Sequence, residues 1–199
     1  MKIAIIDYGL GNLRSVFRGL EEAGAQAVIT SNPDEIASAD GLVLPGVGAF
    51  SEGMEQLGPL RELVTGSARS VPLLGICLGM QMLMETSEEH GIHAGLGLIP
   101  GSVKKFPKTT GYKIPHMGWN SLRVESDHPL FAGFGPAEHV YFVHSFYADT
   151  TPEYTLASTE YIFPFASSVA YNNTCGVQFH PEKSGAAGLR LLKNFIGMC

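Results

Sequence analysis

The residues best suited to chemistry lie at one sharp turn, Gly75-Ile76-Cys77-Leu78-Gly79. It follows a short apolar run at residues 71–74 and leads into an apolar stretch that a helix would accept. A cysteine between a strand and a helix, with glycine two residues to either side, has the pattern of a nucleophile elbow. The start of a helix favours the thiolate form, and the N–H of Leu78 is left free to bind an oxyanion. The alternative for any single cysteine is a buried structural role.

A candidate base lies near the other end of the chain, in Gln178-Phe179-His180-Pro181-Glu182. The strand predicted before it ends at Phe179, so His180 is expected at the same edge of the sheet as Cys77. The carboxylate of Glu182 can accept the imidazole N–H, fix the tautomer and stabilise the charged ring. A histidine taken alone is more often a satisfied core or surface residue. Together with a cysteine elbow, the pair predicts the nucleophile, base and orienting group of acyl transfer.

A glycine-rich loop, Pro45-Gly46-Val47-Gly48, follows another predicted strand. Two glycines allow backbone conformations that other residues avoid, and hence a close approach of N–H groups to a ligand. We interpret Val47 or its neighbours as a second donor to the oxyanion. An ordinary turn between a strand and a helix is the alternative.

The other histidines and cysteines give weaker patterns. His90 and His93 resemble a metal pair, but no cysteine or carboxylate cluster completes a zinc site, so we expect neither a metal nor a cofactor. His144 and Ser145 end a predicted strand and are expected to line the pocket. Cys175 lies inside a predicted strand, which indicates packing.

The elements that must position these residues alternate between strand and helix in the first half of the chain. Strands are expected at residues 3–6, 27–29, 41–44 and 71–74, and helices at residues 13–20 and around 54–68. A further helix should begin at Asn32, with Pro33 in its first turn and Glu35 reaching back to the cap. Strands separated by helices predict a parallel sheet, whose ligands bind beyond the carboxyl ends of the strands. Cys77 and Pro45 lie there, as does Asp7.

The second half predicts antiparallel hairpins that extend the sheet. Strands are expected at residues 121–124, 139–143, 154–157, 167–171 and 175–179, after loops with short strands at 86–115. Tyr171-Asn172-Asn173-Thr174 is typical of a tight turn, and Ser184 is expected to cap a last helix. The predicted fold is therefore α/β, a central, mostly parallel open sheet flanked by helices, in a single domain of residues 1–199.

Composition excludes several classes of protein. The chain has 199 residues, 45% of them hydrophobic, and a formal net charge of −6 without a basic run, which argues against nucleic-acid binding. Its three cysteines form no disulfide framework and fit a reducing cytoplasm. No apolar run reaches membrane-spanning length, and the chain opens on a strand without a signal peptide.

With these motifs the chain resembles the class I (triad) glutamine amidotransferases. The elbow followed by Met80-Gln81 and the His-Pro-Glu motif resemble the two signatures of that family. Four further blocks, at residues 7–13, 45–50, 115–120 and 141–145, resemble the branch that serves histidine biosynthesis. The blocks occur in order over nearly the whole chain.

The resemblance implies that Cys77 attacks the side-chain amide of glutamine, that His180 acts as general acid and base, and that Glu182 orients it. The oxyanion hole would be formed at Val47 and Leu78. A glutamine pocket is implied at Gly46, Gly48, Gln81, His144 and Ser145.

The resemblance also implies a partner, because nothing in this chain consumes the ammonia. The partner would be a (β/α)₈-barrel cyclase bound as a heterodimer, with Asn12, Trp119, Asn120 and Lys183 on the docking face. A buried core position is the alternative for Trp119. We further expect the loop at residues 45–48 to turn an N–H toward the oxyanion hole only when the partner binds its ligand.

Three other functions are compatible with parts of this pattern. The first is another glutaminase of the class, such as that of pyridoxal phosphate synthesis, although the blocks at 7–13 and 115–120 argue against it. The second is a cysteine hydrolase or esterase, in which the acid normally precedes the histidine in the chain. The third is an inactive binding module, which the intact triad argues against.

Overall fold

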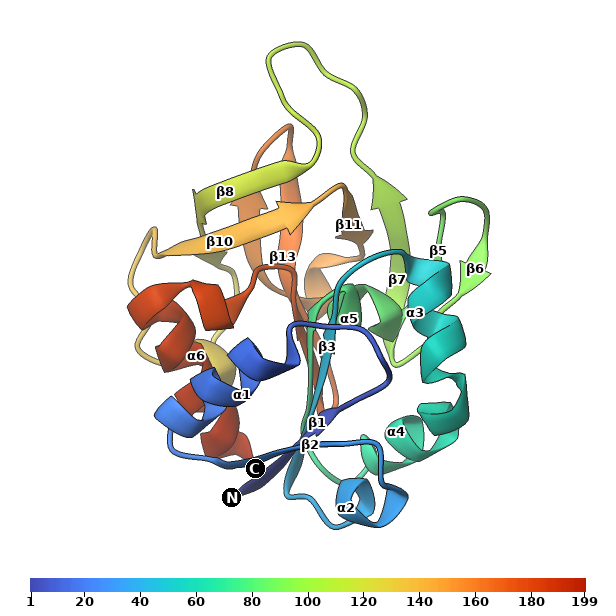
Figure 1. The fold of residues 1–199 in the computed structure, drawn as a ribbon. Coiled ribbons are helices and arrows are strands. Elements are labelled where there is room, and N and C mark those ends of the chain that lie inside the picture. Colours follow the sequence, from blue (N-terminus) through green and yellow to red (C-terminus); the bar gives the residue numbers. More distant parts are fainter.

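The computed structural model describes residues 1–199 and is organised around a twelve-stranded sheet (Figure 1). Its parallel part has the order β2-β1-β3-β4-β14. These strands are β2 (Gln26–Thr30), β1 (Lys2–Ile6), β3 (Gly41–Gly46), β4 (Leu73–Cys77) and β14 (Thr174–Val177). The predicted α/β fold with a mostly parallel open sheet is confirmed, and the carboxyl ends of the five strands meet at one edge.

Antiparallel strands continue the sheet beyond β14, as predicted. In order they are β13 (Pro164–Tyr171), β11 (Phe146–Asp149), β7 (Ile99–Lys105), β5 (Met84–Ser87) and β6 (His93–Ala94), while β12 (Thr155–Glu160) and β9 (Arg123–Val124) branch from β13. Within this part only β5 and β7 are parallel. The predicted tight turn joins β13 to β14, with Tyr171 opposite Thr174 and Asn172 at a φ of 53°.

A separate two-stranded sheet lies over the carboxyl ends of the parallel strands (Figure 1). It consists of β8 (His116–Ser121) and β10 (His139–His144), which are antiparallel. The strand predicted at 121–124 was therefore wrong in position, because only the two-residue β9 lies there. Polar residues and Gly118 interrupt the apolar–polar alternation of β8, so the sequence did not predict this strand. β5 and β11 are too short to give a recognisable pattern.

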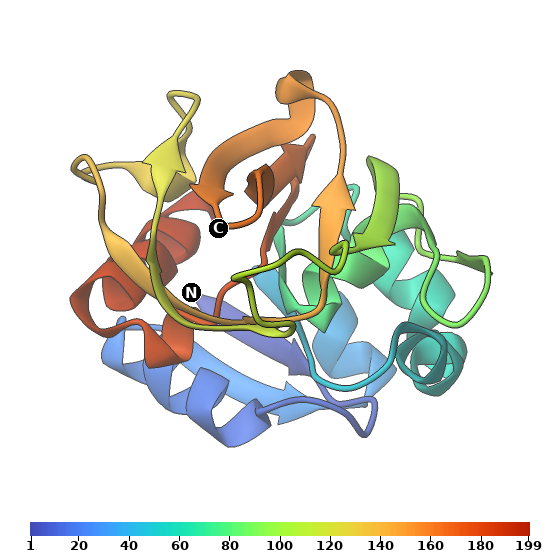
Figure 2. The same ribbon diagram turned by 90° about the horizontal axis from the view of Figure 1, so that it is seen from above.

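Helices cover both faces of the sheet. α1 (Leu13–Glu22) and α6 (Gly185–Met198) pack on one face, and α2 (Pro33–Ala37), α3 (Phe50–Leu57) and α4 (Arg61–Ser67) on the other (Figure 2). Alternate side chains of β1 pack into two hydrophobic cores, one on each face of the sheet. Ile3 and Ile5 face α1 and α6, and Ala4 and Ile6 face the layer of α2, α3 and α4. The helix predicted around 54–68 is two helices separated by a 3₁₀ turn at Gly58–Leu60. None of the helices has the length and hydropathy needed to cross a membrane.

The start of α2 agrees with the prediction only in part. Asn32 caps the helix by accepting from the N–H of Asp34 at 2.9 Å. Glu35 does not reach back to the cap, because its carboxylate accepts a hydrogen bond from the Thr30 hydroxyl instead. The Thr30 oxygen in turn accepts from the N–H of Asn32 at 2.9 Å.

Candidate active site

Cys77 lies at a strained turn between β4 and α5 (Leu78–Leu83), with φ 55° and ψ −110°. A positive φ is unfavourable for a residue with a side chain, and such strain is typical of a nucleophile elbow. The bracketing glycines let the turn pack closely. A Cβ on Gly79 would lie 1.8 Å from the carbonyl oxygen of Leu44, and one on Gly75 would lie 2.8 Å from the Met80 nitrogen. The elbow is therefore pressed directly against β3.

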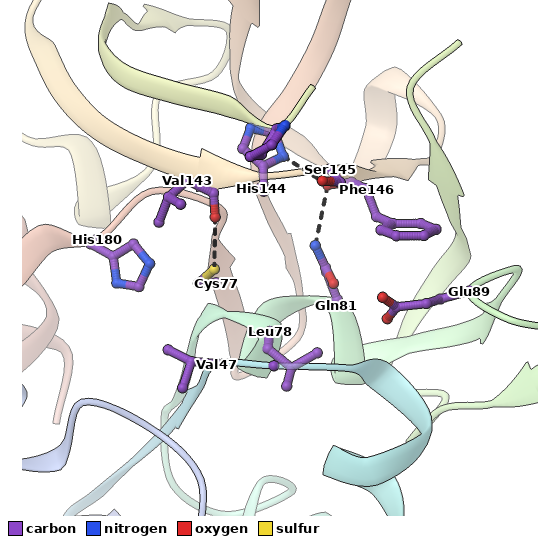
Figure 3. Close-up of a pocket in the computed structure, with 12 residues that line it drawn as sticks. Val47, Cys77, Leu78, Gln81, Glu89, Val143, His144, Ser145, Phe146 and His180 are labelled. Carbon is purple, nitrogen blue, oxygen red and sulfur yellow. Dashed lines mark hydrogen bonds between the residues drawn. The ribbon is translucent and has the colours of Figure 1, made fainter. Parts of the chain in front are cut away.

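His180 and Glu182 form a buried pair beside this turn. Nδ1 of His180 lies 2.8 Å from Oε1 of Glu182, and the two side chains are only 2% and 1% exposed. Burial lowers the pKa of His180, but the interactions with Cys77 and Glu182 outweigh it and raise the pKa to about 9. Nε2 has no hydrogen-bond partner within the protein, and the ring points toward Cys77 (Figure 3). This nitrogen is therefore available to exchange a proton in the pocket.

The turn that carries His180 is tied to β10. The His180 N–H donates to the carbonyl of Tyr141 at 2.9 Å. The hydroxyl of Ser184 donates to the His180 carbonyl at 2.6 Å and accepts from the Tyr141 N–H at 3.0 Å. Ser184 occupies the N-cap position of α6 as predicted, but its side chain does not cap the helix, because the hydroxyl bonds to the His180 carbonyl and to the Tyr141 N–H of β10.

Cys77 and His180 open into one cavity of about 430 Å³, a size that suits a small ligand. Its lining consists of Val47, Gly48, Cys77, Leu78, Gln81, Glu89, Pro115, Val143, His144, Ser145, Phe146 and His180 (Figure 3). Of the residues predicted for the oxyanion hole and the pocket, only Gly46 is not part of this lining. A Cβ on Gly46 would lie 2.7 Å from the hydroxyl of Tyr8 and 2.9 Å from the Leu78 Cβ, so Gly46 packs behind the elbow.

Hydrogen bonds fix the polar wall of the cavity. Gln81 donates from Nε2 to the Phe146 carbonyl at 3.2 Å, and Nδ1 of His144 lies 2.7 Å from the same oxygen. Since a carbonyl only accepts, Nδ1 of His144 carries the proton and its Nε2 accepts from Nδ1 of His116 at 2.9 Å. Burial lowers the pKa of His144 to about 3 and that of His116 to about 4, so both rings are neutral.

Two polar residues at the site had no role in the sequence prediction. The carboxylate of Glu89 lines the cavity and accepts from the N–H of Phe50 at 2.7 Å, at the start of α3. The side chain of Gln178 donates from Nε2 to the sulfur of Cys77 at 3.7 Å. Glu89 lies in a loop without periodicity, so no pattern reveals it. Gln178 belongs to the His-Pro-Glu motif, and its position two residues before the histidine was the available signal.

The residues predicted to contact a partner lie in different settings. Trp119 is 58% exposed, which excludes a core position, and its ring is 6.1 Å from that of Tyr141. Nζ of Lys183 lies 5.9 Å from the same Tyr141 ring, and Asn12 is half-buried before α1. Asn120 was predicted to contact the partner, but its side chain does not point outward. Its amide points inward and donates to a backbone carbonyl at 2.9 Å.

Comparisons with known proteins agree with this geometry. The family model described as "Glutamine amidotransferase class-I" matches residues 4–198. The imidazole glycerol phosphate synthase subunit HisH of Methanosarcina acetivorans is 56% identical over 100% of this chain and 99% of its own length, and that of Archaeoglobus fulgidus is 46% identical over 98% of each. The structure of PurLQS from Thermotoga maritima superposes with a TM-score of 0.76 at 19% identity, covering 98% of this chain and 97% of that one, a likeness of fold alone.

Proposed function

Because the chain belongs to the class I glutamine amidotransferase family, we propose that it is the glutaminase subunit of an imidazole glycerol phosphate synthase, in histidine biosynthesis. Relatives of that name, 46–56% identical over nearly the whole chain, support this branch over the one that serves pyridoxal phosphate synthesis. The observation that carries the chemistry is the shared pocket. Cys77, at its strained turn, and His180, which is paired with Glu182, line one cavity.

The first half of the reaction forms a thioester. The thiolate of Cys77 attacks the side-chain amide carbon of glutamine, and the carbonyl π electrons move onto oxygen. The N–H groups of Leu78 and Val47 stabilise this oxyanion. Imidazolium at His180 then donates its Nε2 proton to the leaving nitrogen, the C–N bond breaks, and ammonia departs. The pKa of about 9 supports this role, because a histidine so raised is protonated at neutral pH.

The second half hydrolyses the thioester. His180, now neutral, accepts a proton from water as the water oxygen attacks the thioester carbon. The tetrahedral intermediate collapses with cleavage of the C–S bond, which releases glutamate and regenerates the thiolate. Glu182 holds the ring in the tautomer that directs Nε2 to the reacting atoms in both halves.

Recognition of glutamine needs groups for both ends of the molecule. Glu89 is the acidic residue of the cavity lining and supplies a partner for the α-ammonium group. Gln81 lines the same cavity with His144 and Ser145 and contacts the side-chain amide of glutamine. Glutamate is rejected because its carboxylate cannot provide the N–H donors of the amide, and buried groups left unpaired are costly.

Ammonia must reach a partner before water protonates it. The partner is a (β/α)₈-barrel cyclase subunit in a heterodimer, which uses the ammonia to make imidazole glycerol phosphate and aminoimidazole carboxamide ribonucleotide. The exposed side chain of Trp119 supports a docking surface there, because tryptophan is typical of interface anchors, and Lys183 contacts the same Tyr141 ring as Trp119. Binding of the cyclase ligand shifts the loop at residues 45–48 toward the state with its N–H in the oxyanion hole.

Reconstitution tests the proposal. The chain is mixed with a cyclase subunit, and glutamate release is measured with and without the cyclase's nucleotide substrate. We expect slow release from the chain alone and fast release from the liganded complex, in step with imidazole glycerol phosphate. A complex that makes product from ammonium salts but never from glutamine would refute the glutaminase assignment. Equal rates for the isolated chain and the liganded complex would refute only the loop switch.

A further inference from the structure

Gln178 is a fully buried side chain that contacts the sulfur of Cys77. The parallel pairing of β14 with β4 aligns Val177 with Ile76, so the next residues along the two strands, Gln178 and Cys77, come side by side. The N–H of Gln178 donates to the carbonyl of Ser167 at 2.9 Å, which fixes its backbone. Its side chain is 0% exposed, and Nε2 lies 3.7 Å from the sulfur. The contact therefore follows from the register of the sheet.

The orientation of this amide follows from its neighbours. Gln81 donates to the carbonyl of Phe146 at 3.2 Å, which identifies its Nε2, since a carbonyl cannot donate. The same Nε2 lies 3.0 Å from the side-chain oxygen of Gln178, which must accept. The NH₂ group of Gln178 is therefore the end directed at the sulfur. Flipping this amide would set donor against donor at Gln81.

A donor at this position has a clear electrostatic consequence. Cys77 is only 7% exposed, so its thiolate loses most of its hydration. The carbonyl oxygen of Val143, 4.0 Å from the sulfur, accepts from the thiol but repels the thiolate. Hydrogen bonds to an ionised acceptor are roughly twice as strong as those between neutral groups.

We propose that Gln178 is a further catalytic residue, whose side-chain N–H donates to the Cys77 thiolate while Gln81 holds the amide in the donating orientation. The proposal rests on the proposed function, because it gives Cys77 the role of nucleophile. It gives the sulfur a partner that stays a donor at every pH, because an amide does not titrate. Substrate binding at Gln81 is thereby linked to the charge of the nucleophile through one shared hydrogen bond.

The test measures how readily Cys77 ionises. In a Cys199→Ser background the remaining cysteine besides Cys77 is Cys175, which is fully buried. The rate of Cys77 alkylation by iodoacetamide is followed from pH 5 to 10 by mass spectrometry. Gln178→Met keeps the length of the side chain without the donor, and Gln178→Glu replaces the donor with a carboxylate. Losing a hydrogen bond to a charged group predicts a shift of the alkylation midpoint to higher pH by about one unit, more for Gln178→Glu.

Turnover provides the second readout. In the reconstituted complex, kcat/KM for glutamine at pH 7 should fall about 10- to 100-fold in Gln178→Met and recover partly as the pH rises. A merely structural defect would not be relieved by alkali. The matched control is Ser168→Ala, which removes a buried hydroxyl that donates to the carbonyl of Gly176 at 2.9 Å, away from the cavity. Its alkylation midpoint should equal that of the wild type.

The outcomes separate the two proposals. If alkylation of Cys77 leaves wild-type glutaminase activity intact, the role of Cys77 is wrong. If alkylation abolishes activity but neither Gln178 variant shifts the midpoint, the role of Gln178 is wrong. Should both variants fail to fold, NMR of the wild-type side-chain amides decides. The Gln178 NH₂ signal should move with the same midpoint as alkylation, and a signal constant over that range would overturn the proposal.

Discussion

Gly79 packs so closely against β3 that adding one methyl group, in Gly79→Ala, tests the geometry of the elbow. A Cβ at Gly79 would lie 1.8 Å from the Leu44 carbonyl oxygen and 2.8 Å from its carbonyl carbon. Carbon and carbonyl oxygen normally approach to about 3.3 Å, so Gly79→Ala requires a displacement of roughly 1.5 Å. Both neighbours are backbone atoms, and no side-chain rotation can relieve the clash. The elbow must therefore move away from β3 and from the loop that follows it.

The expected effects can be given as magnitudes. Overpacking of this kind costs about 1–3 kcal/mol of unfolding free energy, measured by urea titration. A shift of about 1 Å at catalytic groups can cost about 10²-fold in rate, so kcat/KM for glutamine should fall at least that far in the complex. The matched control is Gly66→Ala in α4, where no heavy atom lies within 4 Å of the added Cβ. It should stabilise the chain by about 0.5–1 kcal/mol and leave kcat/KM unchanged.

Two results would refute this reasoning. One is a Gly79→Ala protein with wild-type stability and activity, because the elbow would then not be pressed against β3. The other is a Gly66→Ala protein that loses activity as severely, because the loss would then reflect any added methyl group.

Three further predictions follow from the buried histidines and the exposed tryptophan. The interactions with Cys77 and with Glu182 raise the pKa of His180 to about 9, so the stability that they contribute is full below about pH 6.5 and is lost as the pH rises through about 9. Glu182→Gln should therefore lower the unfolding free energy more at pH 6 than at pH 9.5, and an equal loss at both would contradict the pairing. With pKa values lowered to about 4 and about 3, the rings of His116 and His144 should keep the NMR shifts of neutral imidazole from pH 8 to about 5, and a titration midpoint near 6.5 in either would disprove their burial. Trp119→Ala should weaken cyclase binding by about 30-fold in calorimetry without changing the urea midpoint, and an unchanged affinity would exclude this face from the interface.

Patterns of local spacing predict the parts of the molecule that depend on neighbours in the chain. The continuous apolar runs at β1, β3 and β4 and the glycines around Cys77 specify buried parallel strands and a tight elbow. The Asn172–Asn173 turn is equally local, because a two-residue hairpin needs a positive φ that asparagine tolerates.

Contacts between distant segments could not be predicted in the same way. β8 pairs with β10 in a separate sheet, in which His116 lies opposite His144, and no periodicity in the sequence carries that information. Ser184 is the N-cap residue of α6, but its hydroxyl bonds to His180 and to Tyr141 instead of to the helix. The contact of Gln178 with the sulfur depends on the register between β14 and β4, which the sequence does not state.

The most direct test of the account compares the loss of the Cys77 sulfur with the loss of the Cys175 sulfur. Glutamate release by the reconstituted, liganded complex is measured for Cys77→Ala and for Cys175→Ala, whose cysteine is fully buried in β14. The account predicts a loss of about 10³-fold or more for Cys77→Ala and a rate near that of the wild type for Cys175→Ala. A Cys77→Ala complex that still releases glutamate at the wild-type rate would contradict it.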